Sequence, residues 1–323
     1  MPLASNQNGP SERYHRLGAY FRTVFGGPVR KVSVDAGRGC PNRDGTLSHG
    51  GCLFCDPASF SPSRRAERLP IAHQVARAIE RLRRRRRPKP GAAERFIAYF
   101  QPGTNTHGPP DELAADFRAA LSVEGVVGLS VGTRPDCLPD ETLDLLAELA
   151  ASQWVTVELG LQSTHDATLE WLRRGHDFAS FADAVKRCQH RGLRTTAHLI
   201  LGLPGEGPDE VRTTADRLTQ LAIDGVKLHN LHVVRQTPLA DLYEQGAVRI
   251  VDLPEYAGLV VDLLERLPWR VVVERLAGDA PPDYLLAPDW CLDRQGVRQA
   301  ILREFEQRRS WQGQLANETS GTP

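Results

Sequence analysis

The sequence predicts an α/β protein, a partial (β/α)6 barrel of parallel strands followed by a C-terminal α/β extension. Short apolar runs alternate with amphipathic helical segments from about residue 30 to residue 235. These runs are more continuously apolar than half-exposed strands, as expected when helices cover both faces of a sheet. Polar loops containing glycine follow the strands, and in a barrel such loops meet at the face that carries the active site.

The expected elements follow from this alternation. Strands are predicted at 30–36, 96–100, 126–131, 154–161, 195–201 and 225–234, and helices at 14–25, 66–87, 111–121, 140–151, 166–174, 178–191 and 209–222. The extension is predicted to hold helices at 238–245, 254–267 and 294–309 and a strand at 270–274. The predicted divisions are a disordered N-terminus (1–12), the barrel (13–235), the extension (236–311) and a disordered tail (312–323).

Composition excludes several classes of protein. Forty basic and forty acidic residues give a net charge of zero, so no global field attracts nucleic acid or anionic membranes. Six cysteines in 323 residues are too few for a disulfide scaffold, and their clustering indicates metal binding in a reducing compartment. The N-terminus lacks the apolar run of a signal peptide, and no stretch is apolar enough to span a membrane. We therefore expect a cytoplasmic protein without a membrane partner.

Three cysteines occupy the loop after the first predicted strand. Cys40, Cys52 and Cys55 are separated by gaps of eleven and two residues. Structural zinc sites and ordinary electron-transfer 4Fe–4S clusters use four protein ligands, so three thiolates would leave one position open. His49 in the same loop is a candidate fourth ligand for zinc. On spacing alone, an iron–sulfur cluster, a Cys3His zinc site and unlinked cysteines remain alternatives.

Four segments in this order carry a family resemblance. They are CPNRDGTLSHGGCLFC, TRPDCLPDETLDLL, VELGLQSTHDATLEWLRRGHDF and HLILGLPGE, and the similarity extends over about residues 13–311. The chain resembles the radical S-adenosylmethionine (radical SAM) superfamily, in particular an uncharacterised bacterial family related to the catalytic subunit of Elongator. Its first cysteine gap is longer than the superfamily's common spacing, as in the Elongator-like subgroup. The resemblance implies a TIM-like radical SAM barrel.

The resemblance also implies a cofactor and a reaction. Cys40, Cys52 and Cys55 would bind one 4Fe–4S cluster, whose remaining iron binds the amino and carboxylate groups of SAM. The reduced cluster would cleave SAM to methionine and a 5′-deoxyadenosyl radical, which abstracts hydrogen from a substrate. An electron donor such as flavodoxin or ferredoxin is then a required partner.

Residues that contact SAM are implied at three strand ends. The loop after the second strand is expected to bind the SAM amino group, a Gln and an Arg twelve residues apart are expected to contact the ribose and the carboxylate, and the loop after the fifth strand is expected to lie against the adenine. The candidates are Gly103, Thr104, Asn105, Gln162, Arg174 and Gly202.

Two further residues are candidates for catalysis. Glu158 lies in a predicted barrel strand, where a charge is costly unless it is paired, so a functional role is expected. Cys137 follows the third strand, where it would donate a hydrogen atom or bind a metal; an unreactive buried thiol is the alternative.

The substrate is predicted from the Elongator relationship as a tRNA base. The basic run from Arg81 to Lys89, with Arg64, Arg65 and Arg68, would contact phosphates, although a solvated helix end is an alternative reading of the run. A small-molecule substrate, as in relatives of coproporphyrinogen oxidase, and a noncatalytic metal-binding protein are the alternative functions.

Overall fold

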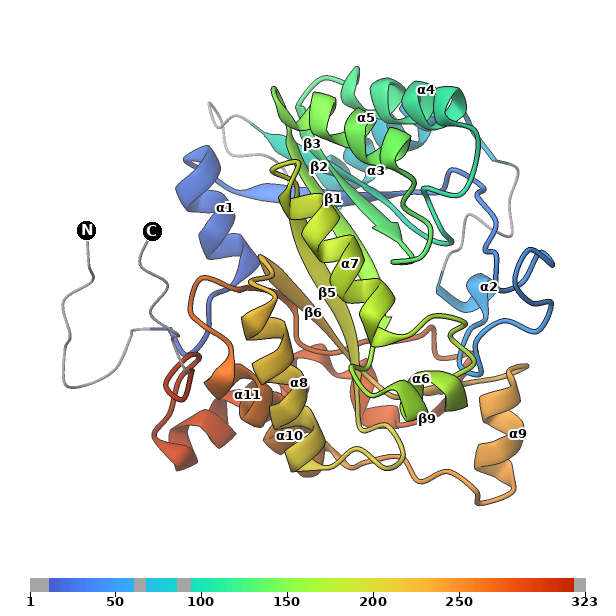
Figure 1. Ribbon diagram of the computed structural model, residues 1–323. Coiled ribbons are helices and arrows are strands. Elements are labelled where there is room, and N and C mark those ends of the chain that lie inside the picture. Colours follow the sequence, from blue (N-terminus) through green and yellow to red (C-terminus); the bar gives the residue numbers. More distant parts are fainter. Residues whose placement is uncertain (1–11, 61–67, 86–93, 317–323) are drawn as a thin grey trace.

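The computed structural model describes residues 12–60, 68–85 and 94–316, and its centre is a curved sheet of seven parallel strands (Figure 1). The strand order is β1-β2-β3-β4-β5-β6-β8. The strands are β1 (Val29–Val34), β2 (Arg95–Phe100), β3 (Val126–Thr133), β4 (Trp154–Gln162), β5 (Arg194–Leu201), β6 (Gly225–Asn230) and β8 (Val272–Arg275). The α/β partial-barrel prediction is therefore confirmed.

Amphipathic helices cover the convex face of this sheet (Figure 1). Helix α3, for example, turns Ile71, Val75 and Ile79 toward the core and its arginines toward solvent. The helices are α1 (Leu17–Phe25), α2 (Pro57–Phe60), α3 (Ile71–Arg85), α4 (Pro110–Leu121), α5 (Asp140–Ala150), α6 (Asp166–Trp171), α7 (Phe178–Gln189), α8 (Pro208–Gln220), α9 (Pro238–Glu244), α10 (Leu253–Arg266) and α11 (Arg294–Arg308), with a 3-10 helix η2 (Asp289–Leu292).

The predicted C-terminal extension contributes to the barrel itself. Strand β8 pairs in parallel with β6, and α10 packs between α8 and α11, so the sheet has one more strand than the predicted six. The single strand predicted over 225–234 was wrong. Pairing with β5 ends at Asn230, and the chain continues as β7 (Val233–Val234), which pairs antiparallel with β9 (Leu285–Ala287).

The ordered chain passes the predicted tail boundary at residue 312. The Gln312 side chain is buried and donates hydrogen bonds to the carbonyl oxygens of Pro268 (3.0 Å) and Val271 (2.8 Å). Residues 1–11 and 317–323, which make up most of the predicted disordered ends, lie outside the described residues. Within the described residues, no helix is both long and apolar enough to cross a membrane.

Candidate active site

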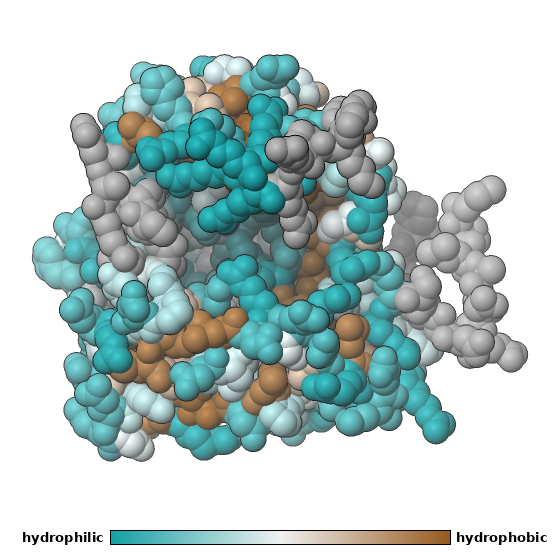
Figure 2. All heavy atoms as spheres, turned by 180° about the vertical axis from the view of Figure 1, so that it is seen from behind, coloured by the Kyte–Doolittle hydropathy of each residue, from teal (hydrophilic) through white to brown (hydrophobic). Residues whose placement is uncertain are grey.

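A cavity of about 850 Å3 lies at the carboxyl ends of the strands, and all three loop cysteines line it. The concave side of the molecule is visibly hollowed there (Figure 2). Residues from β2 to β6 and from β8 form the walls, as expected for a site built at strand ends. Ligand pockets commonly measure about 300–1,000 Å3, so this cavity can hold a cofactor and part of a substrate.

The eleven residues between Cys40 and Cys52 form a loop whose two ends are joined by backbone hydrogen bonds. Turn hydrogen bonds run from the Arg43 and Asp44 amides to the Cys40 carbonyl at 2.7 and 3.1 Å. The Gly51 amide then donates to the Asn42 carbonyl at 2.7 Å, which returns the chain to its starting point. The long gap therefore still places Cys52 beside the segment that carries Cys40.

Nitrogen donors surround the central thiol. Arg174 Nη1 lies 3.2 Å and Asn42 Nδ2 lies 3.4 Å from Cys52 Sγ. Burial, with smaller effects from the neighbouring Cys52 and Cys40, raises the pKa of the Cys55 thiol to about 12. N–H donors of this kind stabilise a thiolate that is coordinated to a metal, so the residues present fit an iron–sulfur cluster. Within the described ranges, no group of three or more His, Cys, Asp or Glu side chains is close enough to hold a metal ion, so ligation by the three cysteines is a proposal.

His49, the candidate zinc ligand, lies on the outer part of this loop. It is exposed, packs against Gly45 and is not part of the cavity wall. Its position gives no support to a Cys3His site.

The cavity includes four of the six predicted SAM contacts. Gly103, Thr104, Gln162 and Arg174 line it. Asn105 and Gly202 do not belong to the wall. The Asn105 amide instead donates to the carbonyls of Phe100 (3.1 Å) and Gly132 (2.8 Å), and so ties the β2 loop to β3. Gly202 packs against Val251, where a Cβ atom would lie 2.7 Å from a methyl group.

Gln162 reaches the cavity because the end of β4 is irregular. The β4–β5 register shifts between Gly160 and Gln162, and Gln162 adopts a positive φ of 77°. An extra residue in a strand re-aims the side chain that follows it. Arg174 is held at the same strand end, because its Nη2 donates to the Gly160 carbonyl at 2.6 Å.

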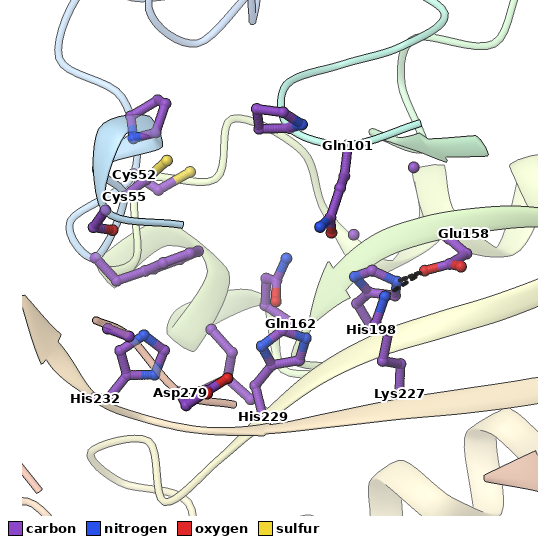
Figure 3. Close-up of a pocket in the computed structure, with 18 of the residues that line it drawn as sticks. Cys52, Cys55, Gln101, Glu158, Gln162, His198, Lys227, His229, His232 and Asp279 are labelled. Carbon is purple, nitrogen blue, oxygen red and sulfur yellow. Dashed lines mark hydrogen bonds and ion pairs between the residues drawn. The ribbon is translucent and has the colours of Figure 1, made fainter. Parts of the chain in front are cut away.

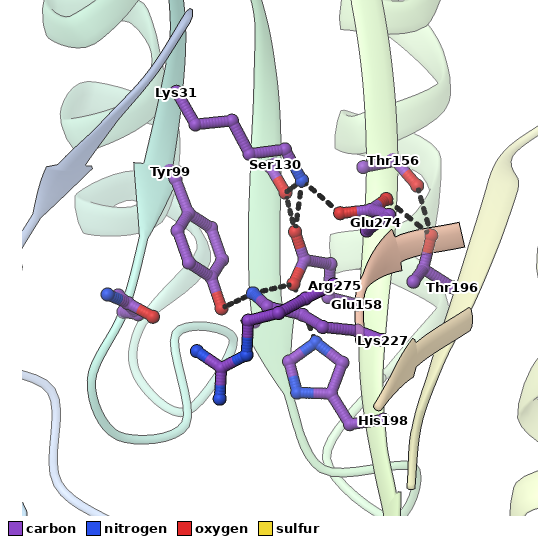
Figure 4. Close-up of polar contacts among 12 residues, drawn as sticks. Lys31, Tyr99, Ser130, Thr156, Glu158, Thr196, His198, Lys227, Glu274 and Arg275 are labelled. Atoms are coloured by element: carbon purple, nitrogen blue, oxygen red, sulfur yellow. Dashed lines mark hydrogen bonds and ion pairs between the residues drawn. The ribbon is translucent and has the colours of Figure 1, made fainter. Parts of the chain in front are cut away.

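Glu158 is fully paired inside the barrel (Figure 4). One carboxylate oxygen accepts from Lys31 Nζ (2.7 Å) and from Ser130, and the other accepts from Lys227 Nζ (2.9 Å) and His198 Nε2 (2.6 Å). Both oxygens of the Glu158 carboxylate therefore already have hydrogen-bond partners. The catalytic role predicted for this residue stays a proposal.

The pKa values in this network follow from its charges. Burial opposes ionisation of Glu158, but the Lys227 and Lys31 ammonium groups outweigh it and hold the pKa of Glu158 well below its usual range. Burial lowers the pKa of Lys227 to about 8, against the opposing effect of Glu158. The network is therefore a set of buried ion pairs and hydrogen bonds that connects β1, β3, β4, β5 and β6.

Two other predicted features lie away from the cavity. Cys137 is not part of the cavity wall, and burial raises its thiol pKa to about 12, which keeps it protonated at neutral pH. In the basic run, Arg83 pairs with Glu94 at 2.6 Å, immediately before β2 begins. The cavity residue Gln101 follows the other end of β2, about 17 Å along the strand. The described part of the run therefore lies at the opposite edge of the sheet, while residues 86–89, Arg64 and Arg65 lie outside the described residues.

Sequence reasoning missed a group of polar residues on the wall opposite the cysteines. His229 lies in β6 and His232 lies two residues after its end (Figure 3), while Arg275 ends β8. A signal was present in the sequence, because Lys227 and His229 are two residues apart in an apolar strand and so share one face.

Family comparisons agree with this geometry. The family model of the radical SAM superfamily matches residues 35–218, and that of the radical SAM C-terminal domain matches residues 223–307. The chain belongs to the radical SAM superfamily. As a member, it is an enzyme of a family whose domain binds a 4Fe–4S cluster and SAM. It is 39% identical over 318 residues to the Bacillus subtilis "Uncharacterized protein YtqA", with 96% of each chain covered.

Two further proteins are similar to this radical SAM protein at lower identity. It is 27% identical over 206 residues to the tRNA uridine(34) acetyltransferase of Dehalococcoides mccartyi, covering 61% of this chain and 44% of that protein. The structure of the archaeal Methanocaldococcus infernus Elp3 superposes with a TM-score of 0.66 at 16% identity, covering 88% of this chain and 64% of that one. The second similarity confirms the fold alone.

Replacing Arg174 should weaken SAM cleavage without removing iron. Arg174→Gln loses the guanidinium that faces Cys52 Sγ and the Gly160 carbonyl, and loss of an outer-shell partner typically costs ~10–100-fold. We expect 5′-deoxyadenosine formation to fall by about that factor while iron per chain is retained. Arg173→Gln, one residue earlier in the chain, is the matched control and should change the rate less than about twofold. Equal losses in both variants would contradict the assignment.

Proposed function

We propose that this radical SAM enzyme holds one 4Fe–4S cluster on Cys40, Cys52 and Cys55, binds SAM at the adjoining strand ends and modifies a tRNA base. When bound, the cluster supplies the electron that cleaves SAM to methionine and a 5′-deoxyadenosyl radical. A low-potential donor such as flavodoxin or ferredoxin would supply that electron. The observation that carries the proposal is a single cavity lined by the three thiols, Gln162 and Arg174.

The chain's own residues would position SAM and exclude water. The Arg174 guanidinium lies beside Cys52, where it would face the carboxylate of SAM. Gln162 projects into the cavity from the irregular end of β4, at the place expected for a ribose contact. The half-buried Phe54 adds an apolar wall between the two last cysteines, which favours a dry site.

A tRNA base is supported by the relatives and by the size of the cavity. A protein 27% identical to this chain is named a tRNA uridine(34) acetyltransferase. Enzymes that act on a base take it out of the stack into an enclosed pocket, and the cavity is large enough for a base next to SAM. The match covers 44% of that relative, so its acetyl transfer is not carried over to this chain.

A small-molecule substrate is the second candidate. It is favoured by the position of the basic run, because Arg83 pairs with Glu94 at the edge of the sheet opposite the cavity. A tRNA whose phosphates contact those arginines would have to extend along the length of a strand to place its base in the cavity.

The test is an anaerobic assay of reconstituted protein with SAM and a strong reductant. We expect 5′-deoxyadenosine, formed at least about ten times faster when tRNA from a strain lacking the gene is added, together with a mass change in one nucleoside of that tRNA. Stimulation by the small-molecule fraction of the same cells, but not by tRNA, would establish the second candidate. A protein that forms no 5′-deoxyadenosine under any of these conditions would refute both.

A further inference from the structure

Two side chains on the wall opposite the cysteines remain unexplained by cluster and SAM binding. His229 lies near the end of β6 (Figure 3), Arg275 ends β8, and both line the cavity. Arg275 Nη2 lies 2.6 Å from His229 Nδ1. Gly278 makes this approach possible, since a Cβ atom there would lie 3.0 Å from both groups.

An irregularity in β8 delivers Arg275 to the cavity. The register of β8 against β6 shifts after Val226, so that Lys227 pairs with Arg275 and Glu274 is the extra residue. In a regular strand, successive side chains point to opposite faces, but a bulge changes that alternation. Glu274 therefore joins Lys31 and Thr196 inside the barrel, while the guanidinium of Arg275 points away from that network toward the cavity (Figure 4).

The charges at this end of the barrel do not balance. Three cations, Lys31, Lys227 and Arg275, lie at this end of the barrel with two carboxylates, Glu158 and Glu274. Lys31 contacts both carboxylates and Lys227 contacts Glu158, whereas no ion pair to Arg275 is found among the described residues. Arg275 is half-buried, and a partly desolvated charge without a counter-ion is costly, so the extra cation indicates a missing anion.

Arg275 has hydrogen-bonding capacity to spare. Its Nε is buried without a hydrogen-bond partner in the described residues. The nearby carboxylate of Asp279 is already bonded to Arg294, with Arg294 Nε at 3.0 Å. Such a guanidinium can offer parallel N–H donors to a phosphate or a carboxylate.

His229 complements this donor. Arg275 Nη2 lies 2.6 Å from Nδ1 and 3.2 Å from Nε2 of the His229 ring, and arginine cannot accept a hydrogen bond. A neutral His229 ring therefore accepts from Arg275 through one nitrogen and keeps an N–H donor on the other. Burial, together with the charge of Arg275, lowers the pKa of His229 well below its usual range, in agreement with a neutral ring.

We propose that Arg275 and His229 form an oxyanion subsite that binds a phosphate or carboxylate group of the substrate. The proposal rests on the proposed function in one respect, namely that substrate shares the cavity with SAM. The subsite is separate from Arg174, which lies beside Cys52 and is the candidate for the SAM carboxylate. A phosphate would belong to the nucleotide whose base is modified, and a carboxylate would belong to a small metabolite.

The experiment measures anion binding and needs no substrate. Inorganic phosphate and acetate are titrated separately into reconstituted, SAM-loaded enzyme at constant ionic strength, with isothermal calorimetry as the readout. We expect saturable binding of at least one anion and at least tenfold weaker binding by Arg275→Gln. Phosphate alone would identify a nucleotide phosphate, and acetate alone a carboxylate. Arg249→Gln is the control, because Arg249 is exposed and pairs with Glu255.

A second variant at the same position covers a loss of folding. If Arg275→Gln does not fold, Arg275→Lys should still weaken binding at least threefold, because one ammonium replaces a planar fork of donors. The absence of saturable binding in the wild type, equal affinity in wild type and both Arg275 variants, or competition between the anion and SAM would overturn the subsite. Failure of the proposed function would instead appear as a wild-type enzyme that forms no 5′-deoxyadenosine, whatever its anion affinity.

Discussion

Cys52→Ala should abolish SAM cleavage and cluster assembly together. Cys52 is buried, accepts from Arg174 and Asn42, and is the central thiol of the three. Removing a ligand should cost more than the ~10–100-fold that follows loss of an outer-shell partner, so we expect at least about a 100-fold fall in 5′-deoxyadenosine formation. Iron per chain, measured after anaerobic reconstitution, should fall from about four to a small fraction of that value.

Two matched variants distinguish this result from a general loss of folding. Cys188→Ala removes a buried thiol in α7 that faces the core, and His49→Ala removes the candidate zinc ligand. Both should retain the wild-type iron content and colour. Loss of bound metal in His49→Ala, or retention of iron in Cys52→Ala, would contradict the three-cysteine assignment.

Glu158→Gln should be strongly destabilising, even though glutamine nearly preserves the shape of the side chain. It removes the negative charge that neutralises Lys227 and shares Lys31 with Glu274. Removing one member of a buried ion pair typically costs about 3–5 kcal/mol, because the remaining charge has no partner. We expect a fall of about 3 kcal/mol in the free energy of unfolding, measured by urea denaturation.

The control is Glu148→Gln, whose carboxylate pairs with Arg118 and is 67% exposed. Exposed pairs contribute little, so its stability should change by less than about 1 kcal/mol. The double variant Glu158→Gln, Lys227→Met should recover part of the loss, since an apolar side chain replaces the unpaired ammonium. A double variant no more stable than Glu158→Gln would show that the network is not electrostatic in origin.

The same carboxylate gives the stability a defined pH dependence. The pKa of Glu158 is depressed in the folded state, so its contribution is full above the ordinary glutamate value of about 4.3 and is lost as the pH falls below it. The stability difference between wild type and Glu158→Gln should therefore shrink on acidification below that value. A difference that stays constant from neutral pH to about pH 3 would contradict this coupling.

Sequence patterns predicted the scaffold well because their signals are local. Each apolar run followed by a polar, glycine-bearing loop became a strand whose carboxyl end carries part of the cavity, as with β2 and Gly103. The error over 225–234 has a tertiary cause. The sheet ends at Asn230, and the next two residues that pair do so with β9, more than fifty residues away. Local propensity cannot distinguish one long strand from two short ones with different partners.

The site residues show the same division. Gln162 and Arg174 were identified through their spacing and do line the cavity. Asn105 and Gly202 were chosen for their place in loops after the second and fifth strands, and they serve the packing of loops instead. Cys137 follows the correct strand end but does not reach the cavity wall. The position of a residue in the sequence therefore predicts the end of the sheet at which it lies. Tertiary contacts decide whether its side chain points into the cavity.

The sequence by itself determined the parallel α/β barrel, the three-cysteine loop and the membership that both imply, because strand periodicity and ligand spacing are properties of neighbouring residues. Only the tertiary structure decided how that loop closes, through the Gly51 to Asn42 hydrogen bond, and where Glu158 finds its partners. It also decided that Arg275 faces the cavity, because one extra residue in β8 shifts the register. Charge balance and strand register depend on contacts between distant segments, and these exist only once the sheet has formed.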